Sequence, residues 1–242
     1  MKKLNHLILL LLLISTIQLW SQEKENSSIP LIGTEAPSFK AESTNGKINF
    51  PEDFGKSWKI IFSHPQDFTP VCSSELLELS YLQPEFDKLG VNVLVVSTDK
   101  LSQHFEWKAN LETISYEGRD PRKINFALVS DENYIISKKY GMFHHSVSTA
   151  KDIRGVYIID PDNIVQSVSF YPMSVGRNMD EYVRTIQALQ TAKDNLVTPA
   201  NWKPGDDVML SYLSAEDKAE QLKGSQSAVY ELAWFMIYKK LP

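Results

Sequence analysis

The sequence predicts an α/β protein in which strands and helices alternate along the chain. Short apolar runs rich in β-branched residues are typical of buried strands, and they occur at 58–64, 91–99, 126–131 and 155–161. Between the runs, apolar residues recur three and four positions apart, as on one face of an amphipathic helix. This alternation favours a central sheet covered by helices.

Three segments are expected to be helices. Over Ser73–Leu89 the apolar residues keep a helical spacing, and 102–111 is also helix-like. The segment 179–190 follows Asn178, a favourable N-cap, and carries two acidic residues in its first turn. Turn-forming residues at 160–163 separate two apolar runs and predict a hairpin.

The N-terminus is typical of a secretory signal peptide, which we place at residues 1–21. Positive residues precede an apolar core over Leu7–Ile14, and Ser21 offers a small residue for cleavage. The core is shorter than the roughly 20 apolar residues that span a bilayer, so an uncleaved anchor is the less favoured alternative. No cysteine stands directly after the core, which excludes a lipid-modified lipoprotein. We therefore expect a secreted or periplasmic protein with no stable membrane association after cleavage.

The rest of the chain divides into three segments. We expect 22–30 to be a flexible mature N-terminus, 31–192 the main domain and 193–242 a small C-terminal extension. Within the extension, 214–223 is helix-like. The apolar stretch 228–242 is expected to pack on the main domain or on another subunit.

Charge and cysteine content limit the possible functions. Removing Lys2 and Lys3 with the signal segment takes the formal net charge from -5 to -7, and no long basic stripe is present, which argues against nucleic acid as a partner. Exported proteins usually pair their cysteines, but this chain has only Cys72. A leftover thiol suggests a reactive group or an intermolecular disulfide.

Cys72 lies where a loop containing Pro65 and Pro70 gives way to a helix. A helix N-terminus favours negative charge on sulfur, and Thr69 can place its hydroxyl near the thiol. A nearby cation would add to this effect, but spacing does not identify one. Taken alone, a single cysteine can equally be a small buried apolar residue.

The string Pro65-Gln-Asp-Phe-Thr69-Pro-Val-Cys72 resembles the Pro-x-x-x-Thr-x-x-Cys signature of the peroxiredoxins. The wider "FSHPQDFTPVCSSEL" is similar to their 1-Cys subgroup, which is typified by peroxiredoxin 6. The likeness runs from about Leu31 into the C-terminal extension, through "IRGVYIIDPDN", "YPMSVGRNMDEYVRTIQALQ" and "TPANWKPGDDVML". It implies a thioredoxin-like fold and a thiol-dependent peroxidase that requires no metal or organic cofactor.

The resemblance also implies roles for particular residues. Cys72 matches the peroxidatic cysteine, Thr69 the hydroxyl that holds the peroxide and Pro65 the proline that shields the thiolate. Arg154 matches the family's arginine beside the sulfur, which supplies the missing cation. The substrate would be hydrogen peroxide or a small organic hydroperoxide, and the product a sulfenic acid at Cys72.

Three supporting residues are expected near the site, each with an alternative. His64 hydrogen-bonds near the sulfur or caps the end of a strand. Glu75 holds an arginine in place or is a solvated helix residue. Arg177 matches a second family arginine or lies on the surface before a helix.

Other motifs are weaker. The stretch "GKSWK" lacks the final glycine of a Gly-x-Ser-x-Gly motif, so we predict no phospholipase activity and an ordinary role for Ser57. The adjacent His144 and His145 are poor evidence for a metal site, because neighbouring side chains usually diverge. Tyr171 and Pro172 are expected to shape the rim of the pocket.

Because the chain has no second cysteine, an external thiol has to reduce the oxidised Cys72. We expect a homodimer, from the family likeness and the apolar C-terminus. The main alternative is a non-enzymatic redox sensor or stress chaperone in which oxidation of Cys72 changes assembly. A cysteine hydrolase is a third alternative, but no local hydrolase signature accompanies Cys72.

Overall fold

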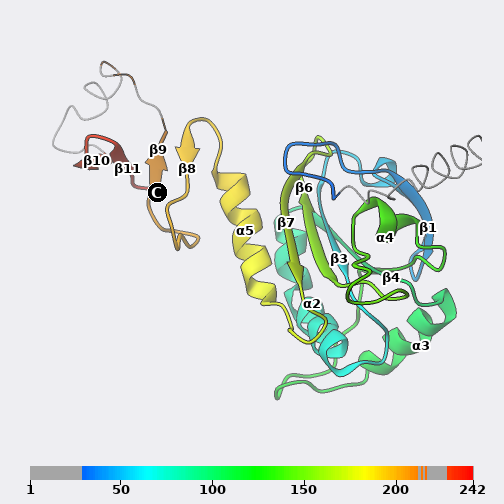
Figure 1. Cartoon of the computed structure of the whole chain (residues 1–242). Coiled ribbons are helices and arrows are strands. Elements are labelled where there is room, and N and C mark those ends of the chain that lie inside the picture. Colours follow the sequence, from blue (N-terminus) through cyan, green and yellow to red (C-terminus); the bar gives the residue numbers. More distant parts are fainter. Residues whose placement is uncertain (1–28, 212–213, 215, 217–227, 242) are drawn as a thin grey trace, which may run out of the picture.

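The computed structural model describes residues 29–211, 214, 216 and 228–241, so the predicted signal peptide lies outside the described residues. Its main body is a seven-stranded mixed sheet in the order β2-β1-β5-β4-β3-β6-β7 (Figure 1). The strands are β1 (Phe39–Ser43), β2 (Gly46–Phe50), β3 (Trp58–Ser63), β4 (Val91–Ser97), β5 (Ala127–Ser130), β6 (Arg154–Ile159) and β7 (Val165–Tyr171). Strands β3, β4 and β5 are parallel, whereas β6 runs antiparallel to β3. The predicted central mixed sheet is confirmed.

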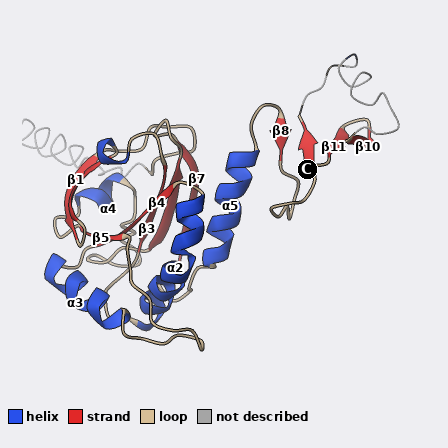
Figure 2. Cartoon of the chain, turned by 180° about the vertical axis from the view of Figure 1, so that it is seen from behind, coloured by secondary structure: helices blue, strands red, loops and turns tan. Residues whose placement is uncertain are grey.

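Helices cover both faces of the sheet. Helices α2 (Pro70–Lys88), α3 (Leu101–Leu111) and α5 (Met179–Thr191) pack on one face, where Ile60, Val93 and Val156 are buried. Figure 2 shows α2 and α5 side by side. The short α4 (Ile135–Lys139) lies on the other face, which buries Phe50, Leu94 and Tyr157. A single-turn helix, η1 (Glu52–Phe54), precedes β3.

Local sequence signals explain where these elements begin and end. Asn178 caps α5 by accepting hydrogen bonds from the backbone N–H groups of Asp180 and Glu181, as predicted. The β6–β7 turn forms where the 160–163 signal predicted it, and Asn163 adopts a left-handed conformation there. Helix α2 begins at Pro70, three residues earlier than the predicted Ser73. Proline suits the first turn because its fixed φ is helical and its missing N–H has no helical partner.

The C-terminal extension forms a second, small sheet in the order β10-β11-β9-β8. Its strands are β8 (Leu196–Val197), β9 (Val208–Leu210), β10 (Val229–Ala233) and β11 (Met236–Lys239). Figure 1 shows this sheet projecting beyond α5, away from the seven-stranded sheet. Its buried residues include Trp202, Val208 and Ile237, and the first two cluster with Ala188 of α5. The predicted helix at 214–223 lies almost entirely outside the described residues.

The apolar C-terminus is a hairpin with an exposed tip. Leu232, Trp234 and Phe235 are 65%, 77% and 63% exposed, so they are not buried on the main domain as one of our two expectations had it. A β-hairpin of alternating residues leaves one face to solvent unless another surface covers it. Packing on another subunit stays a prediction. Within the described part of the chain, none of the helices has the length and apolar character needed to span a membrane.

Candidate active site

The first turn of α2 presents Cys72 to the interior of the domain. Strand β3 ends at Ser63, and the following loop returns the chain to the start of the helix. The Thr69 hydroxyl donates to the carbonyl of Gln66 at 2.8 Å, and the N–H of Ser73 donates to the carbonyl of Thr69 at 2.9 Å. These bonds close the turn, which we call the Cys72 turn (residues 64–73). The Cys72 side chain has no exposed surface.

Arg154 supplies the cation beside the sulfur. Its Nη1 lies 3.4 Å from Cys72 Sγ, and the two residues are 82 positions apart in the chain. The contact follows from sheet topology, because Arg154 is the first residue of β6, which pairs with β3. Nε and Nη2 of Arg154 donate to the carbonyl of Met173 at 2.9 and 2.6 Å, which fixes the plane of the guanidinium. A guanidinium held in this way stabilises negative charge on sulfur.

Glu75 holds both arginines of the site. Its Oε2 accepts from Arg154 Nη1 at 2.7 Å and from Arg177 Nη2 at 2.8 Å. Its Oε1 accepts from the backbone N–H and Nε of Arg177 at 2.8 and 3.0 Å. Burial by itself would raise the pKa of Glu75, but the charge and hydrogen bonds of Arg177 and the charge of Arg154 outweigh it and hold that pKa below its usual value. All three side chains are buried, so Glu75 is not a solvated helix residue and Arg177 is not a surface arginine.

Pro65 and Thr69 lie in the Cys72 turn as predicted. Pro65 is buried and Thr69 half-buried. The Thr69 hydroxyl donates its hydrogen bond to the Gln66 carbonyl, so the Thr69 oxygen is still available as an acceptor.

His64 lies in the interior at the end of β3. It is fully buried directly after β3, and its Nε2 lies 3.5 Å from Asp67 Oδ1. Its ring packs against Trp107 with centroids 5.1 Å apart. Burial lowers the pKa of His64 to about 4, and the opposing charge of Asp67 does not restore it. His64 is therefore a neutral interior residue, and neither of its ring nitrogens has a hydrogen-bond partner among the described residues.

Sequence reasoning missed a second set of contacts, which comes from α3. His104 Nδ1 lies 2.7 Å from Asp67 Oδ2, and Trp107 Nε1 donates to Ser73 Oγ at 3.3 Å. His104 and Trp107 are both buried. The available signal was their spacing of three, which places two interior-facing polar groups on one face of a predicted helix.

The remaining candidates lie outside this cluster. Ser57 precedes β3, donating to the Phe54 carbonyl and accepting from Asn92. His144 and His145 contact different aromatic rings, those of Phe170 and Phe143. No group of three potential metal ligands gathers among the residues that the structure describes.

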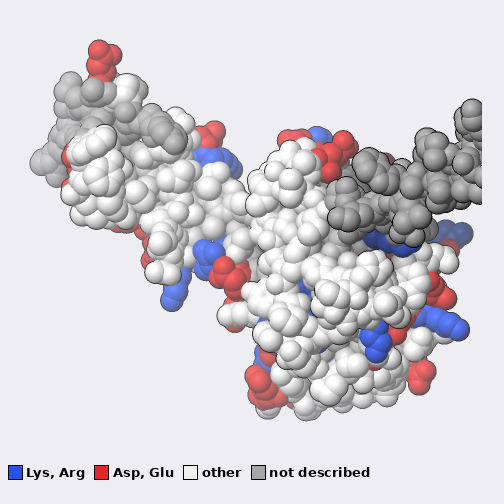
Figure 3. Space-filling view, viewed as in Figure 1, with Lys and Arg blue, Asp and Glu red and all other residues white. Residues whose placement is uncertain are grey.

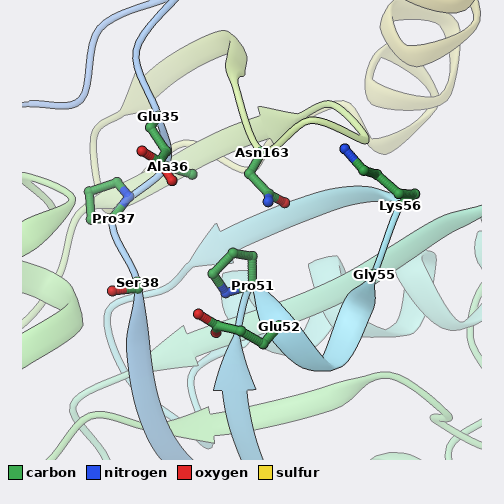
Figure 4. Close-up of a pocket in the computed structure, with 9 residues that line it drawn as sticks. All are labelled: Glu35, Ala36, Pro37, Ser38, Pro51, Glu52, Gly55, Lys56 and Asn163. Carbon is green, nitrogen blue, oxygen red and sulfur yellow. The ribbon is translucent and has the colours of Figure 1, made fainter.

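A hollow of about 550 Å³ lies elsewhere on the molecule (Figure 4). Its lining comes from residues 35–38, from the turn before β3 and from Asn163. Lys56 at its rim pairs with Asp162 at 2.6 Å. None of its lining residues belongs to the candidate site, so we assign the hollow no part in the thiol chemistry. On the face shown in Figure 3, acidic and basic side chains are interspersed.

Comparison with known proteins agrees with this geometry. Residues 32–168 match the model of the AhpC/TSA family, and residues 188–224 match the C-terminal domain of 1-Cys peroxiredoxin. A peroxiredoxin of Methanosarcina mazei is 40% identical over 215 residues, which are 88% of this chain and 98% of the relative. Bovine peroxiredoxin-6 is 38% identical over 198 residues, 79% of this chain and 88% of the relative.

Solved structures show the same fold. Peroxiredoxin 6 of Arenicola marina superposes with a TM-score of 0.75 at 33% identity, covering 88% of this chain and 98% of the other. A yeast mitochondrial 1-Cys peroxiredoxin, whose thiol is resolved through glutathione and thioredoxin systems, gives the same TM-score and identity with 88% and 100% coverage. The thioredoxin-like fold is thus confirmed. With a lone buried thiol beside an arginine and matches along nearly its whole described length, this chain belongs to the AhpC/TSA family of peroxiredoxins, which are thiol-dependent peroxidases.

Proposed function

We propose that Cys72 is the peroxidatic residue of a 1-Cys peroxidase that reduces hydrogen peroxide or small organic hydroperoxides. The sulfur attacks the terminal oxygen of the peroxide, the O–O bond breaks, and the departing oxygen leaves as water or an alcohol after taking up a proton. Cys72 is left as a sulfenic acid. The observation that carries this proposal is the 3.4 Å contact between Arg154 Nη1 and Cys72 Sγ.

The surrounding residues have distinct parts in this step. Arg154 stabilises the thiolate and the charge that develops on the departing oxygen. The Thr69 oxygen accepts a hydrogen bond from the peroxide and aligns it for in-line attack. Pro65 closes the loop over the sulfur and contributes no N–H donor. Glu75 and Arg177 hold Arg154 in place.

Regeneration requires a thiol from outside the chain. One thiol condenses with the sulfenic acid and releases water, which leaves a mixed disulfide at Cys72. A second thiol then attacks that disulfide, restores Cys72 and leaves as the oxidised reductant. A low-molecular-weight or protein thiol of the glutathione or thioredoxin type would serve.

The test is stopped-flow mixing of the mature protein with hydrogen peroxide in the presence of an excess thiol. Wild type is expected to turn over many times, Cys72→Ser to show no turnover, and Arg154→Met to be slower by about 10²-fold or more. Arg184→Met is the matched control, because Arg184 pairs with Glu181 away from the sulfur. Turnover by Cys72→Ser would refute the proposal. A single oxidation that no thiol reverses would favour the redox sensor.

We also propose export and a homodimer. The apolar core of residues 1–21 supports removal of a signal peptide, which mass spectrometry of the protein recovered from the periplasm or medium would reveal. The dimer is supported by two uncovered features: β7 forms one edge of the large sheet, and the 228–241 hairpin exposes its apolar tip. Sedimentation velocity of wild type and of a Trp234→Ser, Phe235→Ser variant would test it, and a monomeric wild type would contradict it.

A further inference from the structure

The charge of the candidate site changes when Cys72 is oxidised. In the proposed reaction the two buried arginines first face two anions, the Glu75 carboxylate and the thiolate, so the formal charges cancel. The sulfenic acid is neutral, which leaves one net positive charge around the sulfur. The next reactant is a thiol that attacks as its thiolate. The oxidised site therefore favours an anionic partner, whereas hydrogen peroxide is uncharged.

A further cation, Lys151, lies against the Cys72 turn. Its ammonium donates to the side-chain carbonyl of Gln66, and the backbone carbonyl of Gln66 accepts from the Thr69 hydroxyl at 2.8 Å. The ammonium is thus linked through Gln66 alone to the oxygen that receives the peroxide in the proposed mechanism. Lys151, Gln66 and Thr69 are all half-buried, so each of them reaches solvent at the edge of the turn.

Local hydrogen bonds fix the position of Lys151. Ser148 Oγ accepts from the backbone N–H groups of Ala150 and Lys151 at 3.2 and 3.0 Å. The Thr98 hydroxyl donates to the Ala150 carbonyl at 3.0 Å. Thr98 directly follows β4, and the Cys72 turn directly follows the parallel β3, so both lie at the same end of the sheet. These bonds hold the backbone before Lys151 beside the turn.

The charge of Lys151 is left without a counter-ion. In the part of the chain that the structure describes, no carboxylate pairs with Lys151, and the amide of Gln66 is neutral. The adjacent Asp152 is buried against Ser137, and burial raises the pKa of Asp152 to about 8, so this acid is mostly protonated at neutral pH. The carboxylate of Asp99, beyond the end of β4, accepts instead from a backbone N–H and a serine hydroxyl.

We propose that Lys151 is a specificity-determining residue that binds the carboxylate of a small reducing thiol at the edge of the Cys72 turn. The inference rests on the proposed peroxidase function and names the class of its reductant. Exchange of the Gln66 amide for a carboxylate is favourable, because an ionised acceptor forms the stronger hydrogen bond. The thiol sulfur then forms an S–S bond with Cys72 while the S–O bond breaks, and the oxygen leaves as water after taking up a proton.

The test compares small thiols that differ in charge. The sulfenic acid at Cys72 is preformed with one equivalent of hydrogen peroxide. Its loss to 3-mercaptopropionate, 2-mercaptoethanol or cysteamine is followed by dimedone trapping and mass spectrometry. Beside the thiol, these compounds carry a carboxylate, a hydroxyl and an ammonium group, respectively. Each rate constant is compared between wild type and variant, so that differences in intrinsic reactivity among the thiols cancel.

For Lys151→Met we expect the 3-mercaptopropionate constant to fall about threefold to fivefold, the 2-mercaptoethanol constant to stay unchanged and the cysteamine constant to rise. Lys151→Arg should keep the wild-type pattern, and high salt should remove the difference between wild type and Lys151→Met. The matched control is Lys139→Met, because Lys139 of α4 also donates to a neutral oxygen, the Ser38 carbonyl before β1. An equal fall for all three thiols, or an unchanged 3-mercaptopropionate constant, would overturn the inference.

Two further arms identify the source of the carboxylate and separate the inference from the proposed function. If Lys151→Met slows the hydroperoxide of linoleic acid but not its methyl ester, and leaves the thiol constants unchanged, the carboxylate belongs to the peroxide and the inference is wrong. Alkylation of reduced Cys72 needs no peroxide, and Lys151→Met should slow iodoacetate about threefold but not the neutral iodoacetamide. A wild type that forms no sulfenic acid would refute the proposed function. The alkylation ratio would still judge Lys151, and an unchanged ratio would count against it.

Discussion

Nη1 of Arg154 lies 2.7 Å from Glu75 Oε2 and 3.4 Å from Cys72 Sγ, so one nitrogen contacts both the carboxylate and the thiol. The carboxylate fixes the direction of the guanidinium before any substrate arrives. Such preorganisation is how fixed charges lower the barrier of a reaction in a water-poor site. The same arrangement leaves two arginine charges dependent on a single buried acid.

Replacing Arg154 by lysine should be far from conservative. Lysine keeps the charge, but a single ammonium cannot reach Glu75, Met173 and Cys72 together as the planar guanidinium does. We expect Arg154→Lys to lower kcat/KM for hydrogen peroxide by about 10²-fold. Stopped-flow kinetics would measure this, with Arg184→Lys as the control at a half-buried arginine that pairs with Glu181. Retention of the wild-type rate would mean that charge alone is enough.

Glu75→Gln should destabilise the fold in a pH-dependent way. Glutamine leaves Arg154 and Arg177 without their buried counter-charge, which should lower the free energy of unfolding by about 3 kcal/mol at pH 7. The pKa of Glu75 is depressed in the folded state, so its stabilisation is present above the unfolded value of about 4.3 and is lost as the pH falls through the folded value. The difference between wild type and Glu75→Gln should therefore shrink on acidification.

Urea denaturation at a series of pH values would measure this difference. Glu85→Gln is a suitable control, because Glu85 pairs with Lys88 on the surface of the same helix and should contribute little. A difference that stays constant from pH 7 to the acid limit would show that Glu75 acts by shape and not by charge.

His64 should make the fold sensitive to mild acid. Burial lowers the pKa of His64 to about 4, whereas an unfolded histidine titrates near 6.5. Between these pH values His64 is protonated in the unfolded chain but neutral in the folded chain, so the free energy of unfolding falls as the pH drops through this window. We expect a loss on the order of 3 kcal/mol in wild type, largely absent in His64→Phe. Equilibrium unfolding from pH 7 to pH 4 measures it, and an equal loss in both proteins would exclude His64 as the cause.

Asp152 should have the opposite effect on the pH dependence of stability, making the fold less stable as the pH rises. It is fully buried, its Oδ2 accepts from Ser137 at 3.1 Å, and burial raises the pKa of Asp152 to about 8 despite that hydrogen bond. Above the unfolded value of about 3.9, the unfolded chain releases a proton that the folded chain keeps, so stability falls as the pH rises toward 8.

Asp152→Asn, which mimics the protonated acid, should accordingly be more stable than wild type by about 1–3 kcal/mol at pH 8 and no more stable near pH 4. Thermal or urea unfolding at the two pH values would detect the change. Asp120→Asn, at an exposed position, should show no such trend. An Asp152→Asn protein that is less stable at both pH values would mean that the ionised carboxylate is needed.

The sequence predicted the elements of the main domain because their apolar periodicity reflects burial on the sheet directly. Strand β4 and helix α3 form within two residues of the predicted 91–99 and 102–111. Cys72 and Thr69 were singled out from their place at a helix start, whereas Arg154 was found only through the resemblance, because spacing alone had not identified the cation. The apolar stretch 228–242 had no such pattern, and within it Val229–Ala233 and Met236–Lys239 form a hairpin where we expected only a packed tail.

Long-range polar contacts were beyond sequence reasoning. The Asp67–His104 and Ser73–Trp107 contacts join residues 37 and 34 positions apart. No local rule pairs a carboxylate in the loop before α2 with a histidine in α3, because α2 and β4 lie between them in the chain. The same holds for Glu75, whose two arginines come from β6 and from the loop before α5. The neighbours of His64, Trp107 and Asp67, likewise became visible only in the fold.

The pairing of β3 with β6 has a consequence for protein engineering. Ser63 Oγ donates to the Ile153 carbonyl and accepts from the Gly155 N–H, which fastens the start of β6 on either side of Arg154. The loop that carries the nucleophile is therefore only one part of the site, and the start of β6, which carries Arg154, is the other. A transplant of residues 64–73 into a foreign scaffold would carry the thiol without its counter-ion, and we expect such a chimera to be chemically inert until a second strand is grafted with it.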